Sequence, residues 1–319
     1  MRRVAMVLVI TGLVAVSLTG CSSGDGADGT VSAADGSVSV VATTTVLGDL
    51  VRNVVGENAE VEVLMPVGVN PHDFQASAQQ VATVQRADLV VANGLGLEAG
   101  LHDVLEAATA DGVRVWEVAP DIEPRPFVEV VDAEEEDDHE DGDLDPHFWL
   151  DPHRVALAAE LLAARLAEAV PGVDWSARAD VYAAELDSLD IRSMERLAVV
   201  APGDRKLVTN HLSLGYFSDR YGFEMIGTVI PGGESLANPS SAELASLVDF
   251  IEREQVRAIF TETIEPDTLA QAVAAEAGYE VKVVELYTGS LGEPGSDGDT
   301  LIKMMETNVG RIAEALGTP

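Results

Sequence analysis

Asp145-Pro146-His147-Phe148-Trp149-Leu150-Asp151-Pro152-His153 lies between a run of acidic residues and a long segment rich in Ala and Leu. Its two Asp-Pro steps favour turns and disfavour helix at the residue before each proline. We therefore expect His147 on a constrained loop that has left a strand and not yet entered a helix. Such loops on rigid scaffolds commonly hold ligand-binding side chains.

Two other histidines stand in similar contexts, each after a short apolar run and before a helix-like stretch. They are His72, in Asn70-Pro71-His72-Asp73-Phe74, and His211, in Thr209-Asn210-His211-Leu212. Neutral imidazole is the commonest metal ligand in proteins and suits zinc well. Each histidine alone could be a hydrogen-bonded structural residue, but three in matching contexts favour one shared metal site.

Neighbouring residues are open to more than one interpretation. Asp73 and Asp151 could orient the histidines through hydrogen bonds or cap helices, and His153 fits a helix start better than a ligand position. His102 fits an exposed helix position. Three aromatic residues are expected to wall a dry cleft: Phe74, Phe148 and Trp149.

Hydrophobic periodicity and turn residues predict strands that alternate with helices along the chain. The predicted strands span residues 38–45, 61–65, 89–92, 113–118, 206–209, 224–229, 258–261 and 281–286. The predicted helices span residues 47–55, 77–86, 101–110, 152–170, 175–199, 214–221, 241–254, 266–277 and 299–316. This alternation indicates an α/β fold: two lobes of parallel sheet flanked by helices and joined by one long helix. Because ligands bind at the carboxyl ends of parallel strands, we expect the histidine loops at that edge.

The amino terminus has the features of a signal peptide over residues 1–20: two arginines, an apolar run from Val4 to Leu18, and small residues before Cys21. Leu18-Thr19-Gly20-Cys21 resembles the bacterial lipobox, which implies cleavage before Cys21 and a lipid anchor on it. The alternative is plain secretion with an unmodified cysteine. Cys21 is the only cysteine, so an internal disulfide is excluded.

The remaining boundaries follow from composition and element order. We expect a flexible tether at 21–36, an amino-terminal lobe at 37–172, a connecting helix at 173–201 and a carboxy-terminal lobe at 202–319. The formal net charge of −36 excludes an ordinary nucleic-acid-binding surface. The acidic loop at 132–145, with His139, is interpreted as a solvated loop or a weak cation collector.

With these motifs in hand, the chain resembles the cluster A-I solute-binding proteins of ABC transporters, which are zinc- or manganese-binding lipoproteins. The resemblance rests on the three histidine motifs and on the ending Met304-Met305-Glu306-Thr307-Asn308. It implies two α/β lobes joined by a rigid backbone helix, with the metal between them. It also implies a membrane permease and its ATPase as partners.

The resemblance implies His72, His147 and His211 as metal ligands. Manganese-type members carry a carboxylate at the third position, so the histidine set here favours Zn²⁺ over Mn²⁺. The fourth position departs from the family pattern, because the expected carboxylate aligns with Gly289. The fourth ligand is then water, Glu262, or a loop carboxylate, Glu234 or Glu293.

The resulting hypothesis is a monomeric, extracytoplasmic protein, anchored through Cys21, that captures Zn²⁺ and delivers it to an ABC permease. It is not expected to be an enzyme. The alternatives are a manganese-binding member of the same family, a zinc-dependent hydrolase with Glu262 as base, and an adhesin. The hydrolase alternative is weakened because the sequence lacks a His-Glu-x-x-His motif.

Overall fold

The computed structural model describes residues 38–128, 144–230 and 239–317 of the chain. Residues 37–319 form one compact unit. The predicted signal peptide, tether and Cys21 lie outside the described residues, as do His139, Glu234 and residues 132–143 of the acidic loop. These predictions and the exact lobe boundaries therefore remain predictions.

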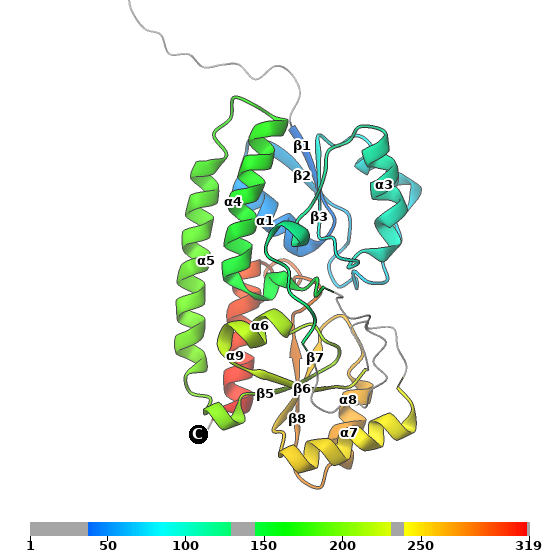
Figure 1. Cartoon of the computed structure of the whole chain (residues 1–319), viewed down its shortest axis with the longest axis vertical. Helices are drawn as coiled ribbons and strands as arrows, with labels where there is room; N and C mark the ends of the chain where they lie inside the picture. Colours follow the sequence, from blue (N-terminus) through cyan, green and yellow to red (C-terminus); the bar gives the residue numbers. More distant parts are fainter. Residues whose placement is uncertain (1–37, 129–143, 231–238, 318–319) are drawn as a thin grey trace, which may run out of the picture. The chain divides into compact units, whose positions relative to one another are not determined.

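Two four-stranded parallel sheets form the framework of this unit (Figure 1). In the first sheet the order is β2-β1-β3-β4, with β1 Val38–Ala42, β2 Ala59–Val63, β3 Leu89–Ala92 and β4 Val115–Glu117. In the second the order is β6-β5-β7-β8, with β5 Lys206–Thr209, β6 Glu224–Thr228, β7 Ala258–Glu262 and β8 Lys282–Leu286. The two sheets thus repeat one topology, in which β5 corresponds to β1 and β7 to β3.

Helices follow or connect the strands. They are α1 Thr45–Val55, α2 Ala78–Val84, α3 His102–Ala110, α4 Pro152–Ala169, α5 Ser176–Leu197, α6 Gly215–Tyr221, α7 Ser241–Glu254, α8 Thr268–Glu276 and α9 Leu301–Leu316. Local sequence starts several of them: Thr44 caps α1, while Ser77 and Ser240 open capping boxes at α2 and α7. The predicted α/β fold is confirmed.

The long helix α5 connects the two sheets. It packs along α4, against α1 of the first half and against α9 at the end of the chain (Figure 1). Its inward face buries Leu186 and Leu189, and exposed ion pairs join Arg192 to Glu306 and Arg196 to Glu314. Burial of apolar side chains along α5 therefore holds helices of both halves against the same helix.

Two local predictions need correction. Strand β1 ends at Ala42 rather than residue 45, because Thr44 turns its side chain to the backbone N–H of Leu47 and starts α1. The segment before His147 does not continue from a strand of either sheet within the described residues. Leu144 instead makes an isolated bridge with Pro126, and His147 precedes the 3-10 turn Phe148–Leu150.

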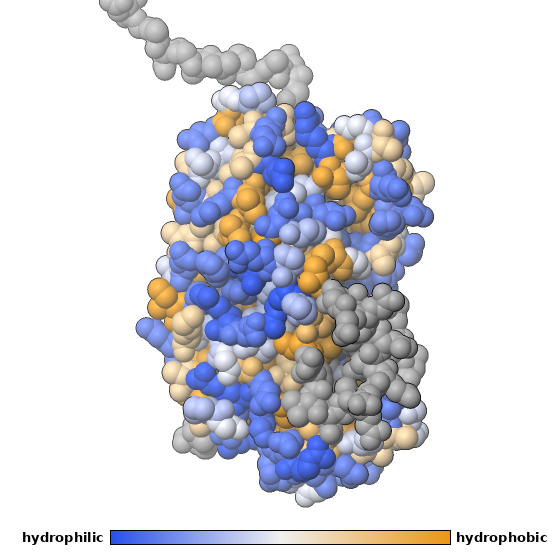
Figure 2. All heavy atoms as spheres, viewed as in Figure 1, coloured by the Kyte–Doolittle hydropathy of each residue, from blue (hydrophilic) through white to orange (hydrophobic). Residues whose placement is uncertain are grey.

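The described surface is mixed in polarity. Figure 2 shows one face, on which hydrophilic side chains are spread over both halves and hydrophobic ones form scattered patches. Within the described ranges, none of the helices has the length and apolar character needed to cross a bilayer.

Candidate metal centre

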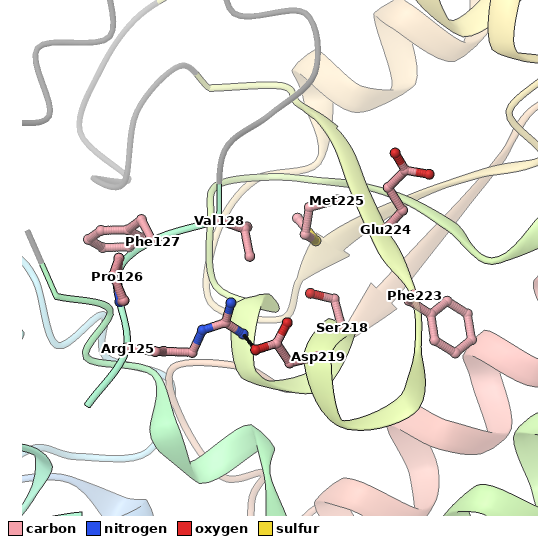
Figure 3. Close-up of a pocket in the computed structure, with 9 residues that line it drawn as sticks. All are labelled: Arg125, Pro126, Phe127, Val128, Ser218, Asp219, Phe223, Glu224 and Met225. Atoms are coloured by element: carbon pink, nitrogen blue, oxygen red, sulfur yellow. Dashed lines mark ion pairs between the residues drawn. The ribbon is translucent and has the colours of Figure 1, made fainter. Parts of the chain in front are cut away.

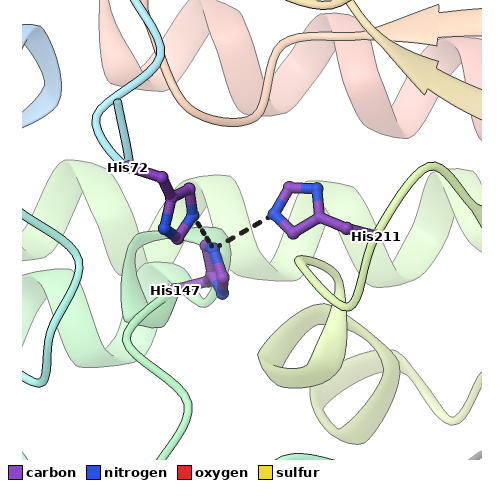
Figure 4. Close-up of side chains that lie close together, drawn as sticks. All are labelled: His72, His147 and His211. Carbon is purple, nitrogen blue, oxygen red and sulfur yellow. Dashed lines mark hydrogen bonds between the residues drawn. The ribbon is translucent and has the colours of Figure 1, made fainter. Parts of the chain in front are cut away.

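The structure brings His72, His147 and His211 together (Figure 4). Nε2 of His147 lies 3.4 Å from Nε2 of His72 and 3.4 Å from Nε2 of His211. The ring of His72 stands perpendicular to that of His211, at a centroid distance of 5.5 Å. Three imidazoles from segments far apart in sequence thus direct one nitrogen each toward a common point. Such a cluster could hold a single metal ion.

His72 lies on the loop that follows β2. The backbone N–H of His72 donates to Oδ1 of Asn70 over 3.0 Å, so the Asn-Pro-His sequence forms an Asx-type turn. Phe74 is buried in the apolar cluster below this turn. His72 itself is partly buried, the most accessible of the three histidines.

His147 is held by a carboxylate two residues earlier. Oδ1 of Asp145 lies 2.8 Å from Nδ1 of His147 and also accepts the backbone N–H of His147 over 2.9 Å. With Asp145 ionised, this oxygen can only accept, so Nδ1 carries the proton and the lone pair of Nε2 faces the other imidazoles. Asp145 is wholly buried, and the backbone carbonyl of Asp145 accepts from the Tyr216 hydroxyl over 3.1 Å.

His211 is held by Glu262, the last residue of β7. Nδ1 of His211 pairs with Oε1 of Glu262, and Oε2 of Glu262 accepts from the Thr288 hydroxyl over 2.5 Å. The backbone carbonyl of Thr288 accepts from Nε1 of Trp149 over 2.8 Å. Glu262 therefore faces the nitrogen of His211 that points away from the other two imidazoles. This placement favours orientation of His211 over direct ligation.

Burial and local charge set the protonation of the three imidazoles. Burial and, to a lesser degree, the neighbouring imidazoles lower the pKa of both His72 and His147 to about 3. Burial also acts to lower the pKa of His211, but the Glu262 carboxylate outweighs it and raises this pKa above its usual value. His72 and His147 are thus neutral, with free lone pairs, across the physiological pH range.

Gly289, aligned with the family carboxylate, is enclosed by neighbours. A Cβ on Gly289 would lie 2.6 Å from Cδ1 of Ile264 and 3.1 Å from Cδ of Pro71. A side chain at this position would therefore require Ile264 and Pro71 to shift. Glu293, another candidate for the fourth ligand, is exposed.

Other residues singled out in the sequence lie elsewhere. Asp73 is exposed, and Asp151 caps α4 by accepting the backbone N–H of the exposed His153. His102 is exposed on α3, in a group of possible ligands with Asp103 and Glu106. Phe148 and Trp149 are core residues, and the Trp149 ring lies 5.4 Å from that of His147.

Sequence reasoning missed the orienting role of Asp145. The signal was present, because Asp145 stands two residues before His147 in the same motif, and the intervening proline constrains the turn between them.

A separate pocket of about 440 Å³ lies beside the site (Figure 3). The Arg125–Val128 segment faces α6 and the start of β6 across it, and an ion pair joins Arg125 to Asp219. None of the three histidines lines this pocket. The convergence of the imidazoles therefore needs no large cavity, as suits a single ion.

The chain matches a protein family, and it is similar to proteins and solved structures of metal-binding function. Residues 40–315 match the family described as zinc-uptake complex component A, periplasmic. The manganese-binding lipoprotein MntA of Halalkalibacterium halodurans is 30% identical, over 99% of this chain and 99% of its own length. The zinc-binding protein TroA of Treponema pallidum is 30% identical, over 89% of this chain and 90% of its own length. The solved structure of periplasmic TroA superposes with a TM-score of 0.78 at 28% identity, covering 89% of this chain and 100% of that one.

Proposed function

Because the chain belongs to the periplasmic zinc-uptake component A family, we propose that it is the extracytoplasmic metal-binding component of an ABC importer, with Zn²⁺ as its cargo. The observation that carries this proposal is the convergence of three imidazoles, with Nε2 of His147 lying 3.4 Å from Nε2 of both His72 and His211. Nitrogens about 2.05 Å from a tetrahedral zinc ion lie about 3.3 Å apart, so the three imidazoles suit one ion without rearrangement.

The donor set supports zinc as the preferred cargo. His72, His147 and His211 supply three nitrogens, and imidazole suits Zn²⁺ while carboxylate and water suit Mn²⁺. Glu262 was a candidate fourth ligand from the sequence. In the structure it pairs with Nδ1 of His211 and accepts a hydrogen bond from the Thr288 hydroxyl. We therefore assign Glu262 to orientation of His211 and leave the fourth position to water. Glu262 faces Nδ1 of His211, on the side away from the other two imidazoles, and this disfavours it as the base of a zinc hydrolase.

In the proposed cycle, the ion is captured between the two halves and released to a membrane permease with its ATPase. The predicted lipid on Cys21 would keep the protein at the membrane surface, where the permease lies. Relatives named for manganese as well as zinc make Mn²⁺ the alternative cargo.

Competitive titration of the purified protein with Zn²⁺ and Mn²⁺ tests the proposal. We expect one Zn²⁺ per chain, bound more tightly than Mn²⁺. His147→Ala should weaken Zn²⁺ binding by more than the roughly 100-fold that loss of an outer partner costs. The matched control is His153→Ala, which removes an exposed imidazole outside the described groups of possible ligands and should leave affinity unchanged. Tighter Mn²⁺ binding would favour the alternative cargo, and an unaltered affinity in His147→Ala would refute the site.

A cellular measurement tests the transport role. Cells that lack the protein should grow slowly when zinc is chelated and recover with added zinc but not manganese. Growth that is insensitive to the loss of the protein would contradict a role in import.

A further inference from the structure

The segment that carries His72, residues 66–73, follows β2 of the first sheet but is fastened to loops of the second. The backbone N–H of Gly68 donates to the Ser290 hydroxyl over 3.0 Å. Nδ2 of Asn70 donates to Oε1 of Glu265 over 2.6 Å. Ser290 follows β8 and Glu265 follows β7. The two hydrogen bonds therefore tie the His72 loop to the ends of two strands in the second sheet.

Asn70 links Glu265 directly to His72. A carboxylate can only accept hydrogen bonds, so Glu265 fixes the side-chain amide of Asn70 with Nδ2 directed toward Glu265. Oδ1 of Asn70 then faces the backbone N–H of His72, which donates to it over 3.0 Å. Asn70 is 8% exposed. A short charge-assisted hydrogen bond at a largely buried side chain holds the turn more strongly than a neutral bond would.

The other two histidines are supported from within their own half of the chain. Asp145 lies two residues from His147, and Glu262 ends the strand that pairs with the strand before His211. Among the described residues, no hydrogen bond or ion pair joins a carboxylate to the ring of His72, although the charge of Glu262 acts on it. The position of His72 therefore depends on contacts that cross between the two halves.

We propose that Glu265 is a positioning residue that keeps His72 in the metal site by holding Asn70 from the opposite half. This inference rests on the proposed metal-binding function and deepens it. The site is complete only while the two halves are apposed. Without the Asn70–Glu265 hydrogen bond the turn that carries His72 would be free to leave the site, so the ion would stay on His147 and His211 alone and dissociate faster.

Zn²⁺ dissociation rates, measured with an excess of chelator, test the inference in the full chain. Glu265→Ala should speed dissociation about tenfold, the lower end of what outer partners of metal ligands contribute. Glu265→Gln keeps an oxygen that accepts from Asn70, so its rate should stay within about threefold of the wild type. The matched control is Asp267→Ala, which removes a carboxylate from the same loop whose hydrogen bond, among the described residues, comes from Gln271 of α8.

The same substitutions in a His72→Ala background separate positioning from general destabilisation. Once His72 is absent, Glu265→Ala should change neither the Zn²⁺ dissociation rate nor the visible spectrum of bound Co²⁺. An equal effect of Glu265→Ala with and without His72, or no effect in the wild-type background, would overturn the inference. A wild-type protein that binds no metal would instead refute the proposed function.

Discussion

Oδ1 of Asp145 lies 2.8 Å from Nδ1 of His147, and both side chains are buried. The carboxylate thereby determines which imidazole nitrogen presents its lone pair to the other two histidines. Burial raises the pKa of Asp145 to about 7, although the backbone N–H of His147 and the charge of Arg125 act to lower it. A bound cation would favour the ionised carboxylate, so metal binding and the charge of Asp145 reinforce each other.

Asp145→Ala should weaken Zn²⁺ binding by about 10- to 100-fold, because His147 would lose the partner that fixes its tautomer and ring orientation. Competitive chelator titration measures the change. The matched control is Asp190→Ala, which removes a buried carboxylate that pairs with Arg220 away from the histidines. The control should lower stability and leave the affinity intact.

Gly215→Ala should displace the Asp145 carboxylate without removing it. A Cβ on Gly215 would overlap Oδ2 of Asp145, so the carboxylate must shift relative to His147. We expect weaker Zn²⁺ binding in Gly215→Ala, with a smaller loss than in Asp145→Ala. If Gly215→Ala bound Zn²⁺ as tightly as the wild type, the position of Asp145 would not control His147.

The pH dependence of metal binding should reflect two groups, His211 and Asp145. His72 and His147, with pKa values lowered to about 3, are already unprotonated between pH 4 and 8. His211, whose pKa is raised by Glu262, is protonated below that raised pKa and must then lose a proton to bind metal. Asp145, with a pKa of about 7, must also be ionised to orient His147. Affinity should therefore fall as pH drops through these two pKa values, by about tenfold per pH unit for each proton. Affinities measured from pH 5 to 8 give the slope.

Glu262→Gln provides the control for this assignment. Removing the carboxylate charge removes the cause of the raised His211 pKa, so the pH at which affinity starts to fall should move lower. A slope of three or more protons, or an unmoved break in the variant, would contradict the assignment of one titration to His211.

Much of the fold could be predicted because local pattern and topology agree. The buried run Leu89–Ala92 and the β-branched run from Val38 match β3 and β1, and the alternation of elements predicts the two parallel sheets. The end of β1 was misjudged because β-branched propensity extends through residue 45, whereas the capping preference of Thr44 prevails. Helix bounds differ from the predicted ones by at most two residues, because caps set the ends.

The site was only partly predictable. The three histidines could be grouped by their shared contexts, but the sequence cannot tell which side of an imidazole a distant carboxylate will face. Glu262 was accordingly a candidate ligand, whereas the structure directs it to Nδ1 of His211. Asn70 and Glu265 are 195 residues apart, and their contact depends on how the two halves meet. No local sequence pattern predicts it.

A buried network behind His147 should also affect metal binding. Nδ2 of Asn93 donates to the backbone carbonyl of Pro146 over 3.0 Å, and the backbone N–H of Asn93 donates to Glu98 over 2.7 Å. Glu98 also accepts from the Thr43 hydroxyl over 2.6 Å and from the N–H of Gly94 over 3.1 Å. This carboxylate holds a turn in which residues 94, 95 and 96 have φ of 82°, 53° and 79°. This turn holds Asn93 in contact with Pro146, the residue before His147.

Asn93→Ala should lower the free energy of unfolding by about 1–3 kcal/mol, the cost of an unmade buried hydrogen bond. It should also speed Zn²⁺ dissociation, because the Pro146 carbonyl would be held only by the N–H of Phe148. The control is Tyr279→Phe, which removes hydroxyl contacts to the carbonyls of Ile251 and Val256 in the second half. Equal dissociation rates in both variants would assign Asn93 a purely structural role.

Close packing at Gly289 leads to the last prediction. Gly289→Ala should lower the free energy of unfolding by about 1–3 kcal/mol through overpacking against Ile264 and Pro71. Gly289→Asp alone should gain no metal selectivity, because the new side chain must displace the same neighbours. In an Ile264→Ala background the carboxylate has space, and the ratio of Mn²⁺ to Zn²⁺ affinity should rise because carboxylate suits the harder ion. Competitive titration of the single and double variants measures this ratio. A rise in Gly289→Asp alone would mean that Ile264 does not restrict the fourth position.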